Sequence, residues 1–281
     1  MTLELTRISF LREALGQWRA AGDSIALVPT MGALHVGHLA LIKAAQTEAK
    51  RVVVSIFVNP TQFGPNEDFT HYPRPLAKDL AILNEAGVDA AWLPSAQEMY
   101  PEGFKTSIHV AQLSEGMEGD ARPGHFDGVA TVVAKLLLQI MPDVAVFGEK
   151  DYQQLCVIKR LVEDLNMSCR IMGVPTAREA DGLALSSRNV YLDASQRAIA
   201  PALYSELKSL AKNLVMPANA GIQLLMDNAK ANILVAGFDA VDYLELRDTQ
   251  SLAPLAAHQS PARLLAAVRL GKTRLLDNIE V

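Results

Sequence analysis

The chain has 281 residues, 50% of them hydrophobic, and a formal net charge of −5 at pH 7. This length and apolar content suit one large or two modest domains, and the acidic balance without a long Lys/Arg run argues against a nucleic-acid partner. The sequence shows no signal-peptide pattern, no apolar stretch of membrane-spanning length and no Cys-x-x-Cys pair. We therefore expect a cytoplasmic protein with no membrane partner, in which Cys156 and Cys169 are reduced.

The first 175 residues alternate between predicted strands and predicted helices. Short apolar runs rich in β-branched residues predict strands over residues 24–28, 52–58, 89–93, 144–147 and 169–174. Apolar residues at helical spacing predict helices over residues 7–21, 38–49, 75–86, 127–141 and 150–165. This alternation predicts an α/β fold with a parallel sheet, whose ligands bind beyond the carboxyl ends of the strands.

The pattern changes after residue 174. A polar segment over residues 175–193 separates two predicted domains, residues 1–175 and residues 176–281. The second domain is expected to be smaller and α+β. Its predicted helices span residues 194–213 and 221–236, and its predicted strands span residues 239–246, 263–270 and 274–279. The break over residues 215–222 matches no recognisable pattern.

The turn between the first sheet strand and the next helix carries two histidines, His35 and His38. Unpaired backbone N–H groups and the helix dipole favour an anion at such a turn, and Gly32 and Gly37 allow close backbone approach. A phosphate-rich ligand is the expected occupant. The dipole also favours a neutral His38 ring that donates a hydrogen bond. The alternatives are an idle, solvated pair or part of a metal site.

Amide side chains follow the predicted strand 52–58. Asn59, Thr61 and Gln62 lie at its carboxyl end, where amides can bind hydroxyls and a carboxylate without adding charge. The alternative is turn chemistry around Pro60.

Charged residues follow the predicted strand 144–147 and begin the next helix. Lys150 can neutralise phosphate, Asp151 can accept hydrogen bonds from ribose hydroxyls, and Gln154 lies one helical turn beyond Lys150. A solvated charge cluster is the alternative.

Two further features suit a triphosphate with magnesium. Ser186, Ser187 and Arg188 lie in the polar linker, where two hydroxyls and a guanidinium suit phosphate. A plain surface loop is the alternative there. Asp79, on the predicted helix 75–86, is a candidate Mg²⁺ ligand or an ordinary exposed acid.

Four motifs in this order resemble the pantothenate synthetase (pantoate–β-alanine ligase) family. They span residues 31–38, 58–62, 148–154 and 181–189. The segment Arg122-Pro-Gly-His125-Phe and the ending Leu275-Leu-Asp-Asn278 resemble the same family, so the similarity covers almost the whole chain. This family belongs to the nucleotidylyltransferase superfamily with the His-x-Gly-His turn.

The resemblance implies a Rossmann-like domain over residues 1–175 that binds ATP and pantoate. It implies that the α+β domain over residues 176–281 closes over the active site, and that the protein is a homodimer. The implied reaction condenses D-pantoate with β-alanine, using ATP and Mg²⁺. Pantoate carboxylate attacks the α-phosphate to give pantoyl adenylate and pyrophosphate, and the β-alanine amine then displaces AMP.

The resemblance also implies roles for individual residues. His38 is the implied catalytic histidine, acting with His35, Lys150 and Arg188, while Gln62, Gln154 and Asn59 bind substrate and Asp79 binds metal. The implied ATP-binding residues are Met31, Gly32, Ala33, Leu34, His35, Val36, Gly37, His38, Gly148, Glu149, Lys150, Asp151, Ala177, Leu185, Ser186, Ser187 and Arg188.

An acyl adenylate is labile in water, so a lid is expected, with residues 63–75 and 183–189 as candidates. The competing hypotheses are a nucleotidylyltransferase that retains the nucleotide on its product, a relative of the small aminoacyl-tRNA synthetases, and a non-catalytic ATP-binding module. The acidic composition opposes the tRNA-binding alternative.

Overall fold

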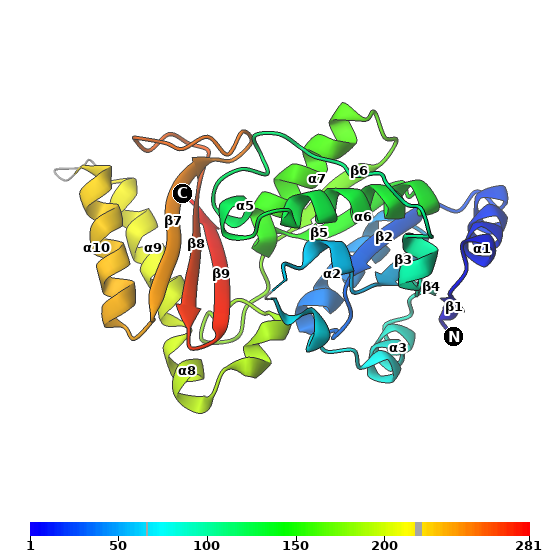
Figure 1. The fold of residues 1–281 in the computed structure, drawn as a ribbon, viewed down its shortest axis with the longest axis horizontal. Coiled ribbons are helices and arrows are strands. Elements are labelled where there is room, and N and C mark those ends of the chain that lie inside the picture. The colour runs from blue at the N-terminus through cyan, green and yellow to red at the C-terminus, as the bar shows by residue number, and fades with distance from the viewer. Residues whose placement is uncertain (66, 217–220) are drawn as a thin grey trace. The chain divides into compact units, whose positions relative to one another are not determined.

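A computed structural model describes residues 1–65, 67–216 and 221–281 (Figure 1). The chain divides into two compact units. The first comprises residues 1–149 and 153–175, and the second comprises residues 150–152 and 176–281. The segment 150–152 therefore belongs with the second unit, although it is surrounded in sequence by the first. The unexplained segment 215–222 lies partly outside the described residues.

The first unit is built on a parallel sheet of six strands in the order β1-β4-β3-β2-β5-β6 (Figure 1). The strands are β1 (Leu3–Leu5), β2 (Ile25–Thr30), β3 (Arg51–Ile56), β4 (Ala90–Trp92), β5 (Val144–Gly148) and β6 (Arg170–Val174). The chain adds β3 and β4 on one side of β2, and then β5 and β6 on the other. The strand order therefore reverses between β2 and β5, which is where open α/β sheets bind their ligands.

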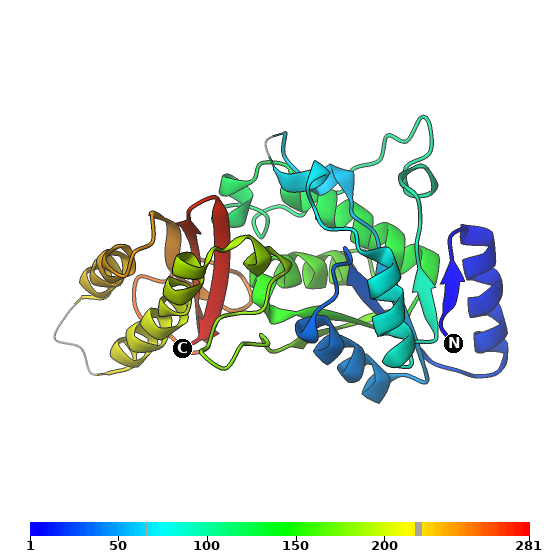
Figure 2. The same ribbon diagram turned by 90° about the horizontal axis from the view of Figure 1, so that it is seen from below.

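Helices cover both faces of this sheet. The longer ones are α1 (Ile8–Ala20), α2 (Val36–Glu48), α3 (Leu76–Glu85), α6 (His125–Ile140) and α7 (Tyr152–Asp164), and the short ones are α4 (Ala96–Met99) and α5 (Glu118–Ala121). Figure 2 shows α2 and α3 on one face and α6 on the opposite face. Short 3-10 turns occur at η1 (Pro60–Gln62), η2 (Asp68–Thr70) and η3 (Glu149–Asp151).

Successive side chains of a central strand point to opposite faces of the sheet, so each face has its own core. On β2, Ala26 and Val28 pack in one cluster with Ile42 of α2 and Leu83 of α3. Leu27 is completely buried and, as the intervening residue of the strand, points to the other face. The strand therefore reads as a continuous apolar run, as expected for a sheet covered on both sides.

The second unit is a three-stranded antiparallel sheet in the order β7-β8-β9, with helices packed against it (Figure 1). Its elements are η4 (Ser187–Tyr191), α8 (Ala194–Ile199), α9 (Ala202–Leu214), α10 (Ile222–Val235), β7 (Ala240–Asp248), β8 (Ala262–Leu270) and β9 (Thr273–Glu280). Leu207 of α9, Ile233 of α10 and Leu264 of β8 are buried in one core. The expected α/β class with a smaller α+β part is thus confirmed.

Three differences from the expected elements have physical causes. Strand β1 was not expected, because three residues at the edge of a sheet carry too short a pattern. The expected helix 194–213 is interrupted before Pro201, which has no N–H to donate and clashes with the preceding turn. The α-helix expected from residue 150 begins at Tyr152, after the 3-10 turn η3.

Across the described ranges, none of the helices combines the length and the apolar character needed to cross a bilayer.

An ion-pair network ties together the amino ends of β2, β3 and β4. The carboxylate of Asp23 accepts hydrogen bonds from Lys50 Nζ at 2.5 Å and Arg51 Nε at 2.8 Å, and Arg51 Nη1 also bonds Asp89 at 2.9 Å. Hydrogen bonds from Lys50 and then Arg51 hold the pKa of Asp23 below its ordinary value. Ionised Asp23 therefore stabilises the fold above the pKa of an unfolded Asp, about 3.9, and this stabilisation is lost as pH falls through the lowered value.

We expect Asp23→Asn to lower the free energy of unfolding at pH 7, with a difference from the parent that shrinks as the pH falls below about 4. Urea denaturation at several pH values measures this difference. Glu85→Gln, at an exposed position at the end of α3, is the control and should show little difference at any pH. An Asp23→Asn penalty that is the same at pH 7 and pH 3 would contradict the network's role.

Candidate active site

Three of the motifs identified in the sequence follow the carboxyl ends of neighbouring strands in the first unit. The turn with His35 and His38 follows β2, Asn59 and Gln62 follow β3, and Gly148 ends β5. Since β2 lies between β3 and β5, the parallel sheet brings these segments to one edge. The reversal of strand order between β2 and β5 falls at the same edge.

The two histidines cap the first turn of α2 and fix each other. His35 is the N-cap residue, and its Nδ1 accepts a hydrogen bond from the Gly37 N–H at 3.1 Å. His38 Nδ1 accepts from the His35 N–H at 3.2 Å, and the ring centroids lie 4.1 Å apart. A ring nitrogen that accepts carries no proton, so this network assigns a neutral His38 with its proton on Nε2. Such a ring can donate to an oxygen of a ligand.

The turn's backbone does not offer the anion site that the sequence suggested. Six of the seven N–H groups between residues 32 and 38 already donate to protein acceptors, namely those of Gly32, Ala33, Leu34, His35, Gly37 and His38. The expectation of unpaired N–H groups at this turn was therefore wrong. An anion here would be met mainly by side chains and by the dipole of α2.

Asp79 is the acceptor that holds the start of this turn. Its Oδ2 accepts from the Ala33 N–H at 2.9 Å, its Oδ1 accepts from the Leu34 N–H at 2.8 Å, and the residue is only 1% exposed. Gly32 fits beside it with a φ of +82°, and a Cβ there would lie 2.9 Å from Asp79 Oδ2. A side chain at position 32 would thus strain the backbone and crowd the carboxylate.

A metal role does not fit Asp79 in this setting. Both of its oxygens accept hydrogen bonds from backbone donors, and the residue is only 1% exposed. Among the described residues, no cluster of three or more His, Cys, Asp or Glu side chains could hold a metal. The carboxylate instead shapes the histidine turn.

The structure links Gln62 to the beginning of the histidine turn. Gln62 Nε2 donates to Met31 Sδ at 3.2 Å, and Gln62 Oε1 accepts from Asn59 Nδ2 at 3.1 Å. Gln62 is half-buried, whereas Asn59 is only 1% exposed and its amide bonds protein groups on both sides. Gln62 is therefore the more accessible of the two amides, while Asn59 contacts it from the buried side. The substrate-binding role expected for Asn59 does not fit this burial.

Burial separates the two adjacent glutamines on α7. Gln153 is 3% exposed and its Nε2 bonds the carbonyl oxygens of Leu113 and Glu115, so it has a structural role. Gln154 is half-buried and remains the candidate for contact with a ligand. Because Lys150 lies on the 3-10 turn before α7, α-helical spacing does not relate it to Gln154.

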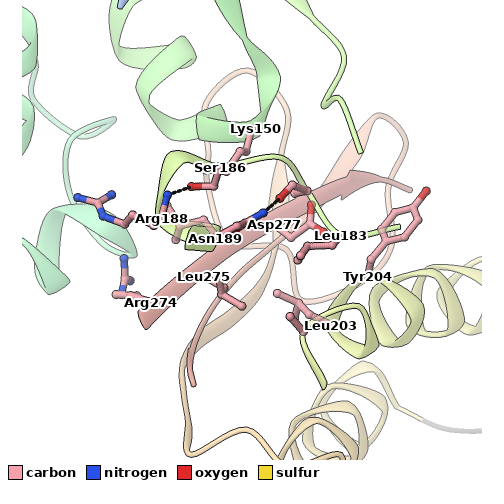
Figure 3. Close-up of a pocket in the computed structure, with 13 residues that line it drawn as sticks. Lys150, Leu183, Ser186, Arg188, Asn189, Leu203, Tyr204, Arg274, Leu275 and Asp277 are labelled. Carbon is pink, nitrogen blue, oxygen red and sulfur yellow. Dashed lines mark hydrogen bonds between the residues drawn. The ribbon is translucent and has the colours of Figure 1, made fainter. Parts of the chain in front are cut away.

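Within the second unit, Lys150, Ser186 and Arg188 line one narrow hollow of about 20 Å³ (Figure 3). Ser186 Oγ accepts from the Arg188 N–H at 3.3 Å and caps η4. The volume suits about one water molecule, so this hollow gathers cations but is not a nucleotide-sized cavity.

Ala177 and the segment starting at Leu185 are also brought together in the second unit. The Leu185 N–H donates to the Ala177 carbonyl at 2.9 Å, beside the bridge between Arg178 and Ala184. These two residues, eight positions apart in the sequence, thus close one small loop.

Sequence reasoning missed several charged residues around the hollow. Arg274 lines it, on the same side as Arg188 in Figure 3, and Arg274 Nε donates to Asp242 at 2.6 Å. Asp277, 4% exposed, accepts two hydrogen bonds from the Arg178 guanidinium at 2.6 and 2.7 Å. The family-like ending Leu275-Leu-Asp-Asn278 could have pointed to these residues, because it lies on β9, which borders the hollow.

Asn278 explains why residues 150–152 belong with the second unit. Its Nδ2 donates to the Lys150 carbonyl at 2.8 Å, and the Tyr152 hydroxyl donates to the Thr249 carbonyl at 2.9 Å. Contacts of this kind join a short segment after β5 to strands far along the chain, and no local pattern predicts them.

We expect Asp79→Asn to lower the free energy of unfolding by about 1–3 kcal/mol, because an amide nitrogen would face one of the two turn N–H groups. The loss should be the same in a chelator as in added Mg²⁺, measured by urea denaturation without nucleotide. Lys78→Ala, on the exposed neighbour in α3, is the control. A penalty that appears only when Mg²⁺ is present would restore the metal role.

Comparisons with known proteins place this arrangement in a family. The family model described as pantoate-beta-alanine ligase matches residues 4–280. A pantothenate synthetase from Paramagnetospirillum magneticum is 57% identical over 274 residues, which covers 98% of this chain and 96% of the relative. One from Sphingopyxis alaskensis is 55% identical, with 98% of each chain covered.

Solved structures of the same family also match this chain closely. The crystal structure of pantothenate synthetase from Thermus thermophilus has a TM-score of 0.92 and 45% identity, with 99% of each chain covered. A pantoate-beta-alanine ligase from Francisella tularensis, in complex with beta-gamma ATP and beta-alanine, has a TM-score of 0.83 and 35% identity over 100% of this chain and 98% of that one. The chain therefore belongs to the pantoate–β-alanine ligase family.

Proposed function

We propose that this enzyme condenses D-pantoate with β-alanine at the expense of ATP. The observation that carries the proposal is the family match over residues 4–280, together with relatives that are more than half identical over nearly the whole chain. The ligase from Francisella tularensis, which holds an ATP analogue and β-alanine, supports the same substrates for this chain.

The proposed reaction has two steps. A carboxylate oxygen of pantoate attacks the α-phosphorus of ATP, an O–P bond forms, and pyrophosphate leaves. The β-alanine amine then attacks the acyl carbon, an amide bond forms, AMP leaves with the electrons of the broken C–O bond, and the amine loses a proton. Neither step needs a covalent bond to the protein.

The chain's residues then have to align the reactants and stabilise charge. We assign the His38 Nε2–H as a donor to a phosphate oxygen, with His35 holding its ring in place through the reciprocal cap. Lys150 and Arg188 supply positive charge for the phosphates. Gln62 and Gln154 are the proposed pantoate ligands, because both are half-buried and uncharged.

The remaining nucleotide assignments are proposals from the family match. They place ATP against residues 31–38, residues 148–151, Ala177 and residues 185–188. Magnesium, when bound to the nucleotide, would offset phosphate charge, and Asp79 would support it only indirectly by shaping the histidine turn.

A homodimer and a cytoplasmic location are proposed from the family match as well. Analytical sedimentation of the enzyme would test the homodimer.

The reaction itself is tested by measuring AMP formation with pantoate and β-alanine supplied separately and together. We expect AMP only when both are present, and ATP–pyrophosphate exchange with pantoate alone. A nucleotidylyltransferase would keep the nucleotide on its product without adding an amine, and a non-catalytic module would bind ATP without exchange. No observation on this chain favours either alternative.

We expect His38→Ala to reduce kcat by roughly a hundredfold or more, because it removes a hydrogen-bond donor to charge that develops in the transition state. Pantoate-dependent pyrophosphate exchange measures the loss. His109→Ala, on an exposed histidine paired with Asp127, should retain the parental rate. Parental turnover in the His38 variant would show that another group supplies the donor.

We expect Gln154→Ala to raise the KM for pantoate at least fivefold more than the KM for ATP, since the amide is assigned to the hydroxy acid and a lost hydrogen bond has this magnitude. Steady-state titration of each substrate gives both constants. The control is Gln97→Ala, at an exposed position of α4. Equal increases for the two substrates would refute the pantoate assignment.

A further inference from the structure

The amide of Asn59 is locked in one orientation by five hydrogen bonds. Its Oδ1 accepts from the Thr61 N–H at 3.3 Å, from Thr61 Oγ1 at 3.0 Å and from the Tyr100 hydroxyl at 2.8 Å. Its Nδ2 donates to Gln62 Oε1 at 3.1 Å and to the Gly128 carbonyl at 3.1 Å. A backbone N–H can only donate and a carbonyl can only accept, so the reversed amide would lose both of those bonds.

This orientation determines which end of Gln62 is presented. Because Asn59 turns its NH₂ toward Gln62, the Gln62 carbonyl oxygen must face Asn59. The Gln62 NH₂ then points the other way, toward Met31 at the start of the histidine turn. A group that meets Gln62 from that side meets a donor.

The backbone of Gln62 is held as firmly as its side chain. Its carbonyl oxygen contacts His125 Nδ1 at 2.9 Å and accepts from Arg122 Nη2 at 3.2 Å, and Arg122 is itself paired with Glu67. Helix α6 approaches so closely that a Cβ at Gly128 would lie 2.3 Å from the Thr61 carbonyl oxygen. The segment Arg122-Pro-Gly-His125-Phe thus supports Gln62.

Tyr100 is the third donor to the Asn59 oxygen and lies among aromatic and cationic neighbours. Its ring lies against Phe104, with centroids 5.1 Å apart, and Lys135 Nζ lies 5.8 Å from the ring centre. Burial is the main cause that raises the pKa of the Tyr100 hydroxyl, which therefore stays protonated and donates near neutral pH.

We propose that Tyr100 is a positioning residue that acts through Asn59 to make Gln62 present its NH₂, so that this position accepts a substrate oxygen and rejects a hydrogen-bond donor. The inference rests on the proposed function and deepens it. For a hydroxy acid, the group accepted is a carboxylate or hydroxyl oxygen. An analogue that offers an amide NH₂ at the same place would meet two facing donors.

The test compares Tyr100→Phe with the parent enzyme in pantoate-dependent ATP–pyrophosphate exchange. We expect the KM for pantoate to rise about fivefold, the effect of one ordinary hydrogen bond, with kcat and the KM for ATP changed less than twofold. Thr131→Val is the matched control, because it removes a different hydroxyl, buried on α6, that accepts one bond, from the Ile108 N–H. It should leave the KM for pantoate unchanged.

A second variant, Gln62→Glu, tests the orientation directly. A carboxylate near neutral pH can accept but cannot donate, so we expect the KM for pantoate to rise more than tenfold while circular dichroism and melting temperature stay close to the parent. If Gln62 instead presented its oxygen to the substrate, a glutamate at position 62 would reproduce that contact. Retention of the parental KM in this variant would therefore overturn the proposal.

The possible results distinguish a failure of the proposed function from a failure of the positioning role of Tyr100. A parent enzyme without pantoate-dependent exchange would remove the proposed function and this inference with it. Exchange in the parent, combined with an unchanged pantoate KM in Tyr100→Phe or an equal rise for ATP, would remove only the positioning role. A pantoate KM raised equally by Thr131→Val would show general loosening of α6 and would also overturn it.

Discussion

A single buried carboxylate sets the shape of the turn on which the proposed chemistry depends. Asp79 accepts from the N–H groups of Ala33 and Leu34, and the ring nitrogens of His38 and His35 accept from those of His35 and Gly37. Most donors at the start of α2 thereby have protein acceptors. Because each Nδ1 is used as an acceptor, the proton of each neutral ring lies on Nε2, where a phosphate oxygen can accept it.

At Gln62, too, the neighbouring donors and acceptors determine which atom is presented to a ligand. A glutamine amide could present either end to a ligand, and the free side chain has little preference. Groups away from the ligand determine which end is presented, because the Tyr100 hydroxyl, the Thr61 N–H and the Gly128 carbonyl together orient Asn59, and Asn59 orients Gln62. Selectivity for an oxygen acceptor then follows from groups that do not themselves meet the ligand.

Positive charge is arranged differently in the second unit. Lys150, Arg188 and Arg274 line one hollow, and Asp277, which also lines it, has its carboxylate paired with Arg178. An acyl-adenylate reaction benefits from such a division, since neutral donors align the reactants and cations stabilise the charge that moves to phosphate. Neither cysteine is needed for this chemistry.

Much of the fold could be read from the sequence, because strand and helix patterns are local. Buried parallel strands such as β2 and β3 are continuous apolar runs, and the order of motifs identified the family over almost the whole chain. The edge strand β1 and the interruption before Pro201 were missed, since the first is too short to show a period and the second lay inside a longer amphipathic pattern.

The sequence by itself determined the fold class and the family, and it supplied the candidate residues of the proposed site. Only the tertiary structure showed what each of them contacts: that Asp79 accepts from two backbone N–H groups, that Asn59 is buried and bonds Gln62, and that Arg274 lines the same hollow as Lys150 and Arg188. The reason is physical. A residue's type limits the hydrogen bonds it can make, but its burial and its partners come from segments far away in the chain.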